Sequence, residues 1–219
     1  MNRIIGQLLL GFTLTSAPYA NAGTIVSTFL PGDLYDTCCG IGNVAPTQVA
    51  FAFEAPIASD FTFTGAALAL SQGIGSVNAV DISLAGDSSG QPGTILESFH
   101  LENALGPAGA NNPPVVVTSV LNPVLLAGSV YWLIETPSTA GNGVNWQTAH
   151  ISASPSLQAT GDGAGSWTVF DDSFISSWPG AFKILADPVS STPEPSAFLL
   201  LGSGLGMALL LRAIRQVPR

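Results

Sequence analysis

Short segments in which hydrophobic and polar residues alternate run through the chain between residues 23 and 189. Alternation with a period of two is typical of β-strands that bury one face. The clearest alternating segments are residues 49–53, 61–63, 80–84, 130–134 and 182–184. Weaker ones are residues 24–29, 66–70, 95–101, 115–121, 145–151 and 167–170. No part of this region has a capped helical stripe, so the pattern predicts an all-β domain.

Turn residues separate most of these segments. Gln91, Pro92 and Gly93 carry the residue types that favour a type II turn. Many short strands with short connections predict two antiparallel sheets packed face to face, a β-sandwich of jelly-roll type. The chain has no repeat of fixed period, which argues against a propeller or a β-helix.

The composition limits the partners of this domain. Hydrophobic residues make up 47% of the chain, charged residues only 9%, and the formal net charge is −9. Lys183 is the only basic residue between Gly23 and Thr192, whereas every acidic residue except Glu194 lies in that interval. Such a body repels polyanions, which excludes nucleic acid as a partner and leaves metal ions and neutral glycans.

The start of the chain has the three parts of a secretory signal peptide. Arg3 is followed by a mostly apolar stretch, and Ala20 and Ala22 form a small-x-small cleavage site. The apolar stretch is shorter than the roughly 20 residues that cross a bilayer. We therefore expect a signal peptide of residues 1–22 and a mature chain that begins at Gly23.

The last 30 residues combine a proline motif, an apolar segment and a basic end. Prolines fix φ and lack an N–H, so the motif stays extended. The apolar segment is just short of a comfortable span, and the positive-inside rule places the arginines after it in the cytoplasm. The parts are Pro193, Glu194 and Pro195 in the motif, residues 197–211 in the apolar segment, and Arg212 and Arg215 in the basic end.

This arrangement resembles the PEP-CTERM sorting signal, a C-terminal element of exported bacterial proteins that an exosortase handles. The match to the signal lies in the tail and implies processing by signal peptidase and exosortase, with Arg212 and Arg215 in membrane retention. The body, with its Pro92-Gly93 turn, Tyr131-Trp132-Leu133 and Asn145-Trp146, also resembles the sandwich domains that commonly precede such a tail. It also implies an inner-membrane intermediate with a C-terminal transmembrane helix, then a product at the cell surface or in the extracellular matrix. The alternative is an ordinary C-terminal membrane anchor. Three parts follow for the chain: residues 1–22, a β-sandwich of residues 23–189, and a sorting signal of residues 190–219.

The domain offers little catalytic chemistry. His100 and His150 lie on expected strands with no second histidine or cysteine at ligand spacing. Ser88 lies in a turn and lacks the Gly-x-Ser-x-Gly pattern of a hydrolase nucleophile. We therefore expect a protein that is not an enzyme and has no cofactor.

Calcium is the metal that the loops favour, because hard cations bind carboxylate and carbonyl oxygens. One candidate group is Asp162, Asp171 and Asp172, and another is Asp33 and Asp36. No spacing matches an EF-hand loop. The alternative is that these acids only keep the surface charged and soluble.

Aromatic residues give the second binding hypothesis. Trp132 alternates with hydrophobic residues, which predicts a core position. Trp167 and Trp178 flank stretches rich in glycine, serine and aspartate, where an exposed indole could stack on a sugar.

Cys38 and Cys39 are neighbours in the chain. In an oxidising compartment they could close a strained vicinal disulfide. Two free thiols, a link to another molecule and a metal contact remain as alternatives.

The function that the sequence predicts is a structural or adhesive one. We expect a non-catalytic exported protein that its tail delivers to the cell envelope or the exopolysaccharide matrix. The alternative is a carbohydrate-binding module with exposed aromatic residues.

Overall fold

The computed structural model describes residues 23–75, 77–149, 155, 157–170 and 179–189. The chain divides into two compact units, residues 1–187 and 188–219. All strands described below lie in the first unit except for the last residue of the final strand. The described residues contain strands and no helix, so the all-β prediction is confirmed.

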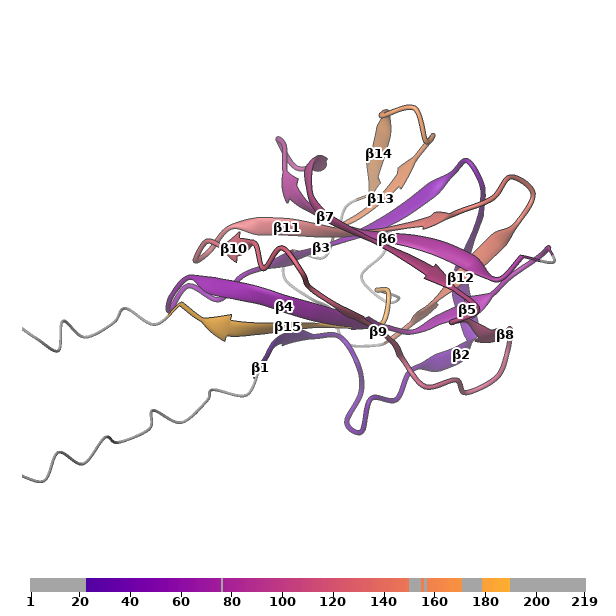
Figure 1. The fold of residues 1–219 in the computed structure, drawn as a ribbon, viewed down its shortest axis with the longest axis horizontal. Helices are drawn as coiled ribbons and strands as arrows, with labels where there is room; N and C mark the ends of the chain where they lie inside the picture. The colour runs from indigo at the N-terminus through magenta and orange to yellow at the C-terminus, as the bar shows by residue number, and fades with distance from the viewer. Residues whose placement is uncertain (1–22, 76, 150–154, 156, 171–178, 190–219) are drawn as a thin grey trace, which may run out of the picture. The chain divides into compact units, whose positions relative to one another are not determined.

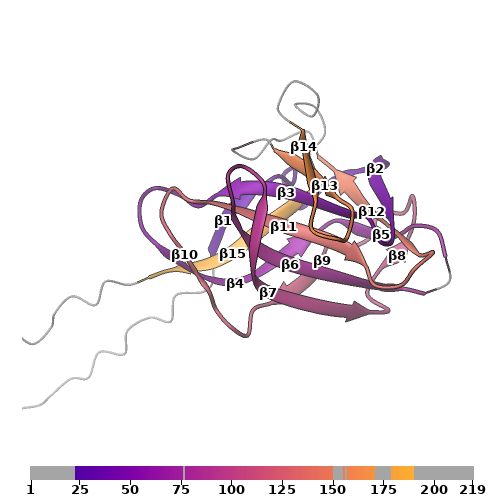
Figure 2. The ribbon, with the colours of Figure 1, turned by 90° about the horizontal axis from the view of Figure 1, so that it is seen from above.

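The largest sheet has six strands and forms one layer (Figure 1). Its strands are β3 (Gln48–Glu54), β6 (Ala79–Asp87), β7 (Pro92–Glu102), β11 (Val130–Pro137), β13 (Gln158–Gly161) and β14 (Trp167–Phe170). They lie in the order β14-β13-β3-β11-β6-β7, and all the pairings are antiparallel. Figure 2 shows the run from β3 through β11 and β6 to β7 from above. At its centre Leu133 of β11 pairs with Phe51 of β3 and with Leu84 of β6.

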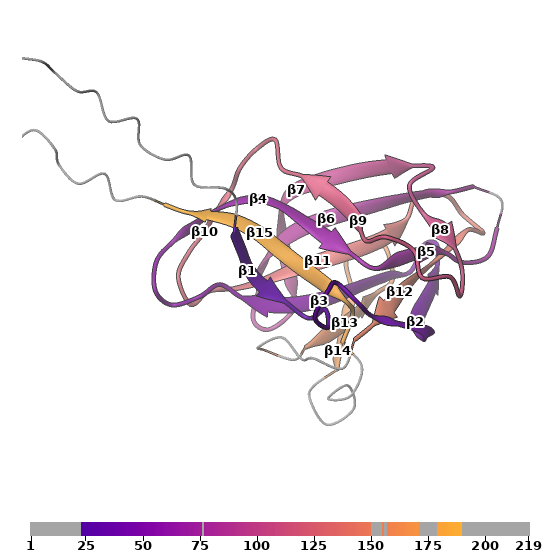
Figure 3. The same cartoon turned by 90° about the horizontal axis from the view of Figure 1, so that it is seen from below.

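Two smaller sheets make the other layer. The first contains β1 (Gly23–Ser27), β4 (Phe61–Leu68), β9 (Val115–Thr118), β10 (Val124–Leu125) and β15 (Phe182–Pro188). The second contains β2 (Asp36–Val44), β5 (Leu70–Gln72), β8 (Gly106–Pro107) and β12 (Gly143–Thr148). Their orders are β1-β15-β4-β10, with β9 also paired to β4, and β2-β12-β5-β8. Figure 3 shows β1, β15 and β4 from below.

The two smaller sheets join at Ala69, the residue between β4 and β5. Its N–H donates to the carbonyl of Ala181 at 2.9 Å, and its carbonyl accepts from the N–H of Gln147 at 2.8 Å. Backbone hydrogen bonds therefore continue from one sheet into the next, and both oppose the six-stranded sheet as one layer.

The hydrophobic core lies between the two layers. Trp146 of β12 and Phe182 of β15 have ring centroids 6.3 Å apart. Across the layers, the Trp146 ring lies 4.9 Å from Phe51, and the Phe182 ring lies 6.3 Å from Phe53. All four side chains are no more than 2% exposed. Because both layers bury aromatic residues in one core, the prediction of a β-sandwich is confirmed.

Most of the predicted strands are present, and four strands were missed. The strand β2 contains glycines, cysteines and small polar residues, and β13 has the sequence Gln-Ala-Thr-Gly, so neither alternates clearly. The strands β8 and β10 have only two residues each. The segments 61–63 and 66–70 belong to β4 and β5, which lie end to end.

No helix of the described residues is long and apolar enough to cross a membrane. The apolar segment 197–211, which we expected to form a transmembrane helix, lies outside those residues.

Candidate functional site

A groove of about 550 Å³ lies between two hairpins, β6–β7 and β13–β14. Both hairpins rise on the outer side of the six-stranded sheet (Figures 1 and 2). The groove is lined by Gly86, Asp87, Ser88, Pro92, Gly93, Thr94, Leu96, Gly165 and Trp167. It combines an indole, a carboxylate and two hydroxyl groups, which is a set that can hold a hydroxyl-rich ligand.

The β6–β7 hairpin has a tight turn at Ser89 and Gly90. Both residues have positive φ, 56° and 81°, and the N–H of Ser88 donates to the carbonyl of Gln91 at 2.9 Å. This is the geometry of a type I′ hairpin turn, whose twist matches the twist of the flanking strands. The prediction of a type II turn over Gln91, Pro92 and Gly93 is therefore wrong. Pro92 instead pairs with Asp87 as the first residue of β7, because the turn that fits the hairpin closes before it.

Asp87 is fixed by hydrogen bonds to both of its carboxylate oxygens. Its Oδ2 accepts from the N–H of Gly90 at 3.0 Å, inside the turn. Its Oδ1 accepts from the indole N–H of Trp132 at 2.8 Å. Trp132 is fully buried, as the sequence predicted, in a small hydrophobic cluster on the outer side of the six-stranded sheet. Its buried indole therefore holds the Asp87 carboxylate at the edge of the groove.

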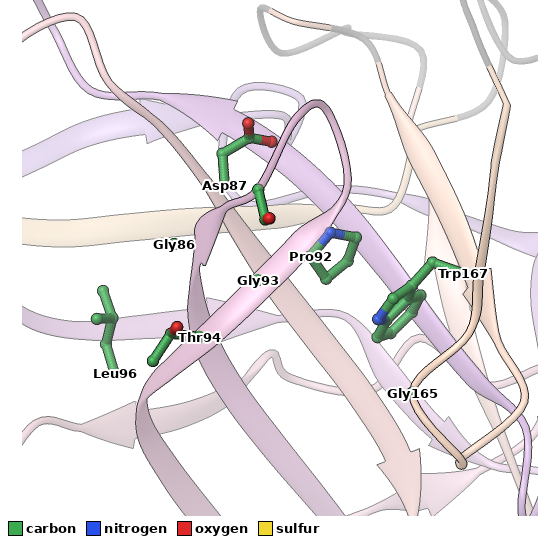
Figure 4. A pocket seen from close by; sticks show the side chains of 9 residues that line it. Gly86, Asp87, Pro92, Gly93, Thr94, Leu96, Gly165 and Trp167 are labelled. Carbon is green, nitrogen blue, oxygen red and sulfur yellow. The ribbon is translucent and has the colours of Figure 1, made fainter.

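Trp167 forms the opposite wall of the groove. The indole projects from β14 toward Pro92 of β7 (Figure 4). Gly161, its partner on β13, leaves room for the ring, since a Cβ there would lie 2.9 Å from Cζ3 of Trp167. The side chain is half-buried and packs on the cluster that contains Trp132. Trp167, one of the two tryptophans that we predicted to stack on a sugar, therefore lines a groove, but it is less exposed than we expected.

Asp162, a predicted calcium residue, closes its own loop. Its Oδ1 accepts from the N–H groups of Ala164 at 2.7 Å and Ser166 at 3.0 Å. These two hydrogen bonds, the one from Ala164 first, lower the pKa of the Asp162 carboxyl below its usual value. Among the described residues there is no group of three or more His, Cys, Asp or Glu side chains placed to hold a metal ion. Calcium binding stays a prediction.

The second pair of calcium candidates lies elsewhere. Asp33 forms an ion pair with Lys183, whose Nζ is 2.6 Å from Oδ2. Asp36 is the first residue of β2.

His100 lies between two carboxylates on the exposed face of β6 and β7. Its Nδ1 is 2.6 Å from Oδ1 of Asp81, and its Nε2 is 3.3 Å from Oε1 of Glu102. The hydrogen bonds to Asp81 and Glu102 raise the pKa of the imidazole. Both ring nitrogens are occupied by carboxylates, and the cluster does not line the groove.

Two buried glutamates were missed by the sequence reasoning. Glu135 on β11 is fully buried, and neither carboxyl oxygen has a hydrogen-bond partner. Burial raises the pKa of Glu135 to about 8. The polar side chain of Asn43 lowers the pKa, but by less than burial raises it. The signal was available, because Glu135 continues the alternation of the core residues Tyr131 and Leu133.

Glu97 on β7 is buried with partners. It accepts hydrogen bonds from the Ser119 hydroxyl at 2.5 Å and from the N–H groups of Val120 at 2.7 Å and Leu121 at 3.0 Å. Burial raises the pKa of the carboxyl, but these hydrogen bonds outweigh burial and leave it below its usual value. Glu97 therefore ties β7 to the loop that follows β9.

The other predicted site residues are only partly covered by the structure. Gly23 is the first residue of β1, and the side chains of Cys38 and Cys39 in β2 are not described. Outside the described residues lie Ala20, Ala22, His150, Asp171, Asp172, Trp178, Pro193, Glu194, Pro195, Arg212 and Arg215.

Comparison with known proteins assigns no family. No protein-family model and no curated protein matches the chain.

Proposed function

We propose that this protein is a non-catalytic exported bacterial protein that a PEP-CTERM sorting signal delivers to the cell envelope or the extracellular polysaccharide matrix. There it has a structural or adhesive role. Signal peptidase removes residues 1–22, and the chain is held in the inner membrane until an exosortase recognises the tail. The observation that carries the proposal is the tail itself, in which the Pro193-Glu194-Pro195 motif directly precedes residues 197–211 and Arg212.

The organisation of the body fits such processing. Its last strand, β15, ends at Pro188, five residues before the motif begins at Pro193. Cleavage near the motif would leave every strand that the structure describes in place, so the sandwich could persist as the finished product. The acidic body also suits a partner that is not a polyanion.

We also propose the jelly-roll type for the sandwich. Successive strands pass repeatedly between the layers: β3 is followed by β4 in the opposite layer, and β11 by β12. Frequent crossing between two sheets is typical of jelly rolls.

Carbohydrate binding is the second candidate function. It is favoured by the groove that Trp167 and Asp87 both line, an open space of suitable size in which the carboxylate is fixed by hydrogen bonds. A matrix protein with such a groove would be retained by the polysaccharide that it binds.

The sorting signal can be tested by changing the motif in the bacterial host. Replacing Pro193, Glu194 and Pro195 by alanine is expected to abolish most delivery to the matrix, because the processing enzyme then lacks its extended recognition segment. Immunoblots of membrane and matrix fractions would show the full chain accumulating in the membrane.

The matched control replaces the adjacent Ser190, Ser191 and Thr192 by alanine. These residues lie in the linker and outside the motif, so delivery should persist. Unchanged delivery of the motif variant would overturn the sorting proposal.

A further inference from the structure

We infer that the groove between the β6–β7 and β13–β14 hairpins binds a neutral saccharide and rejects acidic ones, with Asp87 as the residue that discriminates. The inference rests on the second candidate function, carbohydrate binding, and adds the class of sugar and the means of selection.

The charge of the groove excludes an anionic ligand. Among the residues that the structure describes, its lining contains one charged residue, Asp87, and no lysine, arginine or histidine. Lys183 is the only basic residue between residues 23 and 192, and it is paired with Asp33 at 2.6 Å. A uronate or sulfate in the groove would therefore meet a carboxylate with no cation to compensate it, and like charges in contact are unfavourable.

The same carboxylate suits the hydroxyl groups of a neutral sugar. An ionised carboxylate has about four acceptor sites, and Asp87 uses one on each oxygen, for Gly90 and for Trp132. The remaining sites can accept from sugar hydroxyls. Because two hydrogen bonds fix the side chain, little rotamer freedom is lost when a ligand binds.

The indole supplies an apolar surface for the sugar ring. Trp167 is held against the backbone of Gly161, where a Cβ would lie 2.9 Å from Cζ3 and 3.1 Å from Cε3 of the ring. The glycine thus sets the position of the indole, and the ring projects toward Pro92 (Figure 4). A groove lined by an aromatic ring and by a hydroxyl acceptor matches the two kinds of surface that a neutral sugar has, which are C–H faces and O–H edges.

Binding of polysaccharides to the purified full-length chain in detergent tests the inference. The probes are a neutral soluble glucan, a neutral galactan and a polygalacturonate, measured by titration calorimetry at low and high salt. We expect the native chain to bind at least one neutral polymer and the polygalacturonate at least about tenfold more weakly, a difference of about 1.4 kcal/mol. High salt should narrow the gap, since it screens the repulsion.

Three variants locate the effect. Trp167→Ala should lose neutral-polymer binding by about tenfold or more, and Gly161→Ala should weaken it while keeping the indole. Asp87→Asn keeps an oxygen that can accept from Trp132 and should reduce the discrimination between neutral and acidic polymers. Asp60→Asn, which removes a carboxylate outside the groove, is the matched control and should leave the discrimination unchanged. Near-ultraviolet circular dichroism confirms that each variant is folded.

The outcomes separate the two ideas. If the native chain binds none of the neutral polymers, carbohydrate binding fails and the inference fails with it. If neutral and acidic polymers bind equally and Trp167→Ala abolishes both, carbohydrate binding stands and the discrimination by Asp87 is wrong. Binding that is independent of both Trp167 and Gly161 would overturn the assignment to this groove.

Discussion

Replacing Glu135 by glutamine is expected to remove a large pH dependence from the stability of the protein. The carboxyl group is fully buried on β11 between Val49 and Ile82, its cross-strand neighbours, and neither oxygen has a hydrogen-bond partner. Burial disfavours the ionised form and raises the pKa of Glu135 from 4.5 to about 8. At pH 7 the folded protein therefore keeps this group mostly protonated.

The sign of the effect follows from proton binding. Between pH 4.5 and about 8 the folded state binds the proton of Glu135 more tightly than the unfolded state does. The stabilisation that this tighter proton binding gives the folded state is fully present below pH 4.5, and it is lost as the pH rises toward 8. At 1.4 kcal/mol for each pKa unit, the free energy of unfolding falls by roughly 5 kcal/mol over this window. Glu135→Gln has no such fall, because glutamine stays neutral.

Urea unfolding at pH 5 and pH 8 measures the difference. The native chain should be markedly less stable at pH 8, and Glu135→Gln should be nearly as stable at both values. Glu54→Gln removes a partly exposed carboxyl at the end of β3 and should keep the native fall. If the native chain and Glu135→Gln show the same pH profile, Glu135 is not buried as described.

Trp132→Ala is expected to destabilise the protein by about 3–5 kcal/mol, the usual range for a buried aromatic residue cut to alanine. The side chain is among the largest that are fully buried, and its N–H also holds Asp87. The substitution thus leaves a cavity on the outer side of the six-stranded sheet, in the cluster that Trp167 covers, and frees the carboxylate of the groove. Urea unfolding at pH 5, where Glu135 is neutral, gives the free energy.

Two further variants show which part of Trp132 accounts for this loss of stability and how it compares with Trp167. Trp132→Phe keeps an aromatic ring and removes the N–H, so it should cost less than the alanine variant while still releasing Asp87. Trp167→Ala removes a half-buried indole and should destabilise the fold far less than Trp132→Ala. Equal losses for Trp132→Ala and Trp167→Ala would contradict the roles given to the two indoles, one in the core and one in the groove.

Local alternation was enough to predict most of the strands. Residues 80–84 alternate clearly because β6 has one face in the core. Residues 130–134 also lie within a strand, but β11 is buried on both faces, with Tyr131 and Leu133 in the core and Trp132 on the outer side. The strand β13 has the sequence Gln-Ala-Thr-Gly, which gives no such signal. It is held by its pairing with β3, a contact between residues far apart in the chain.

The candidate site was predictable only in part. Trp167 stood out in the sequence by its residue type and its polar surroundings. Asp87 did not, since its role depends on Trp132, 45 residues away. The groove exists because two hairpins from distant parts of the chain lie side by side. Local sequence patterns carry no information on such long-range contacts. Glu135 could have been found, because the alternation places it inside.

The measurement that tests the sorting proposal most directly is the intact mass of the native protein from its own host. It should be determined separately for the membrane fraction and the extracellular matrix. We expect a matrix product that begins at Gly23 and ends near Pro195. A product that is confined to the membrane and still carries Arg212 to Arg219 would contradict the sorting proposal and make the tail an ordinary anchor.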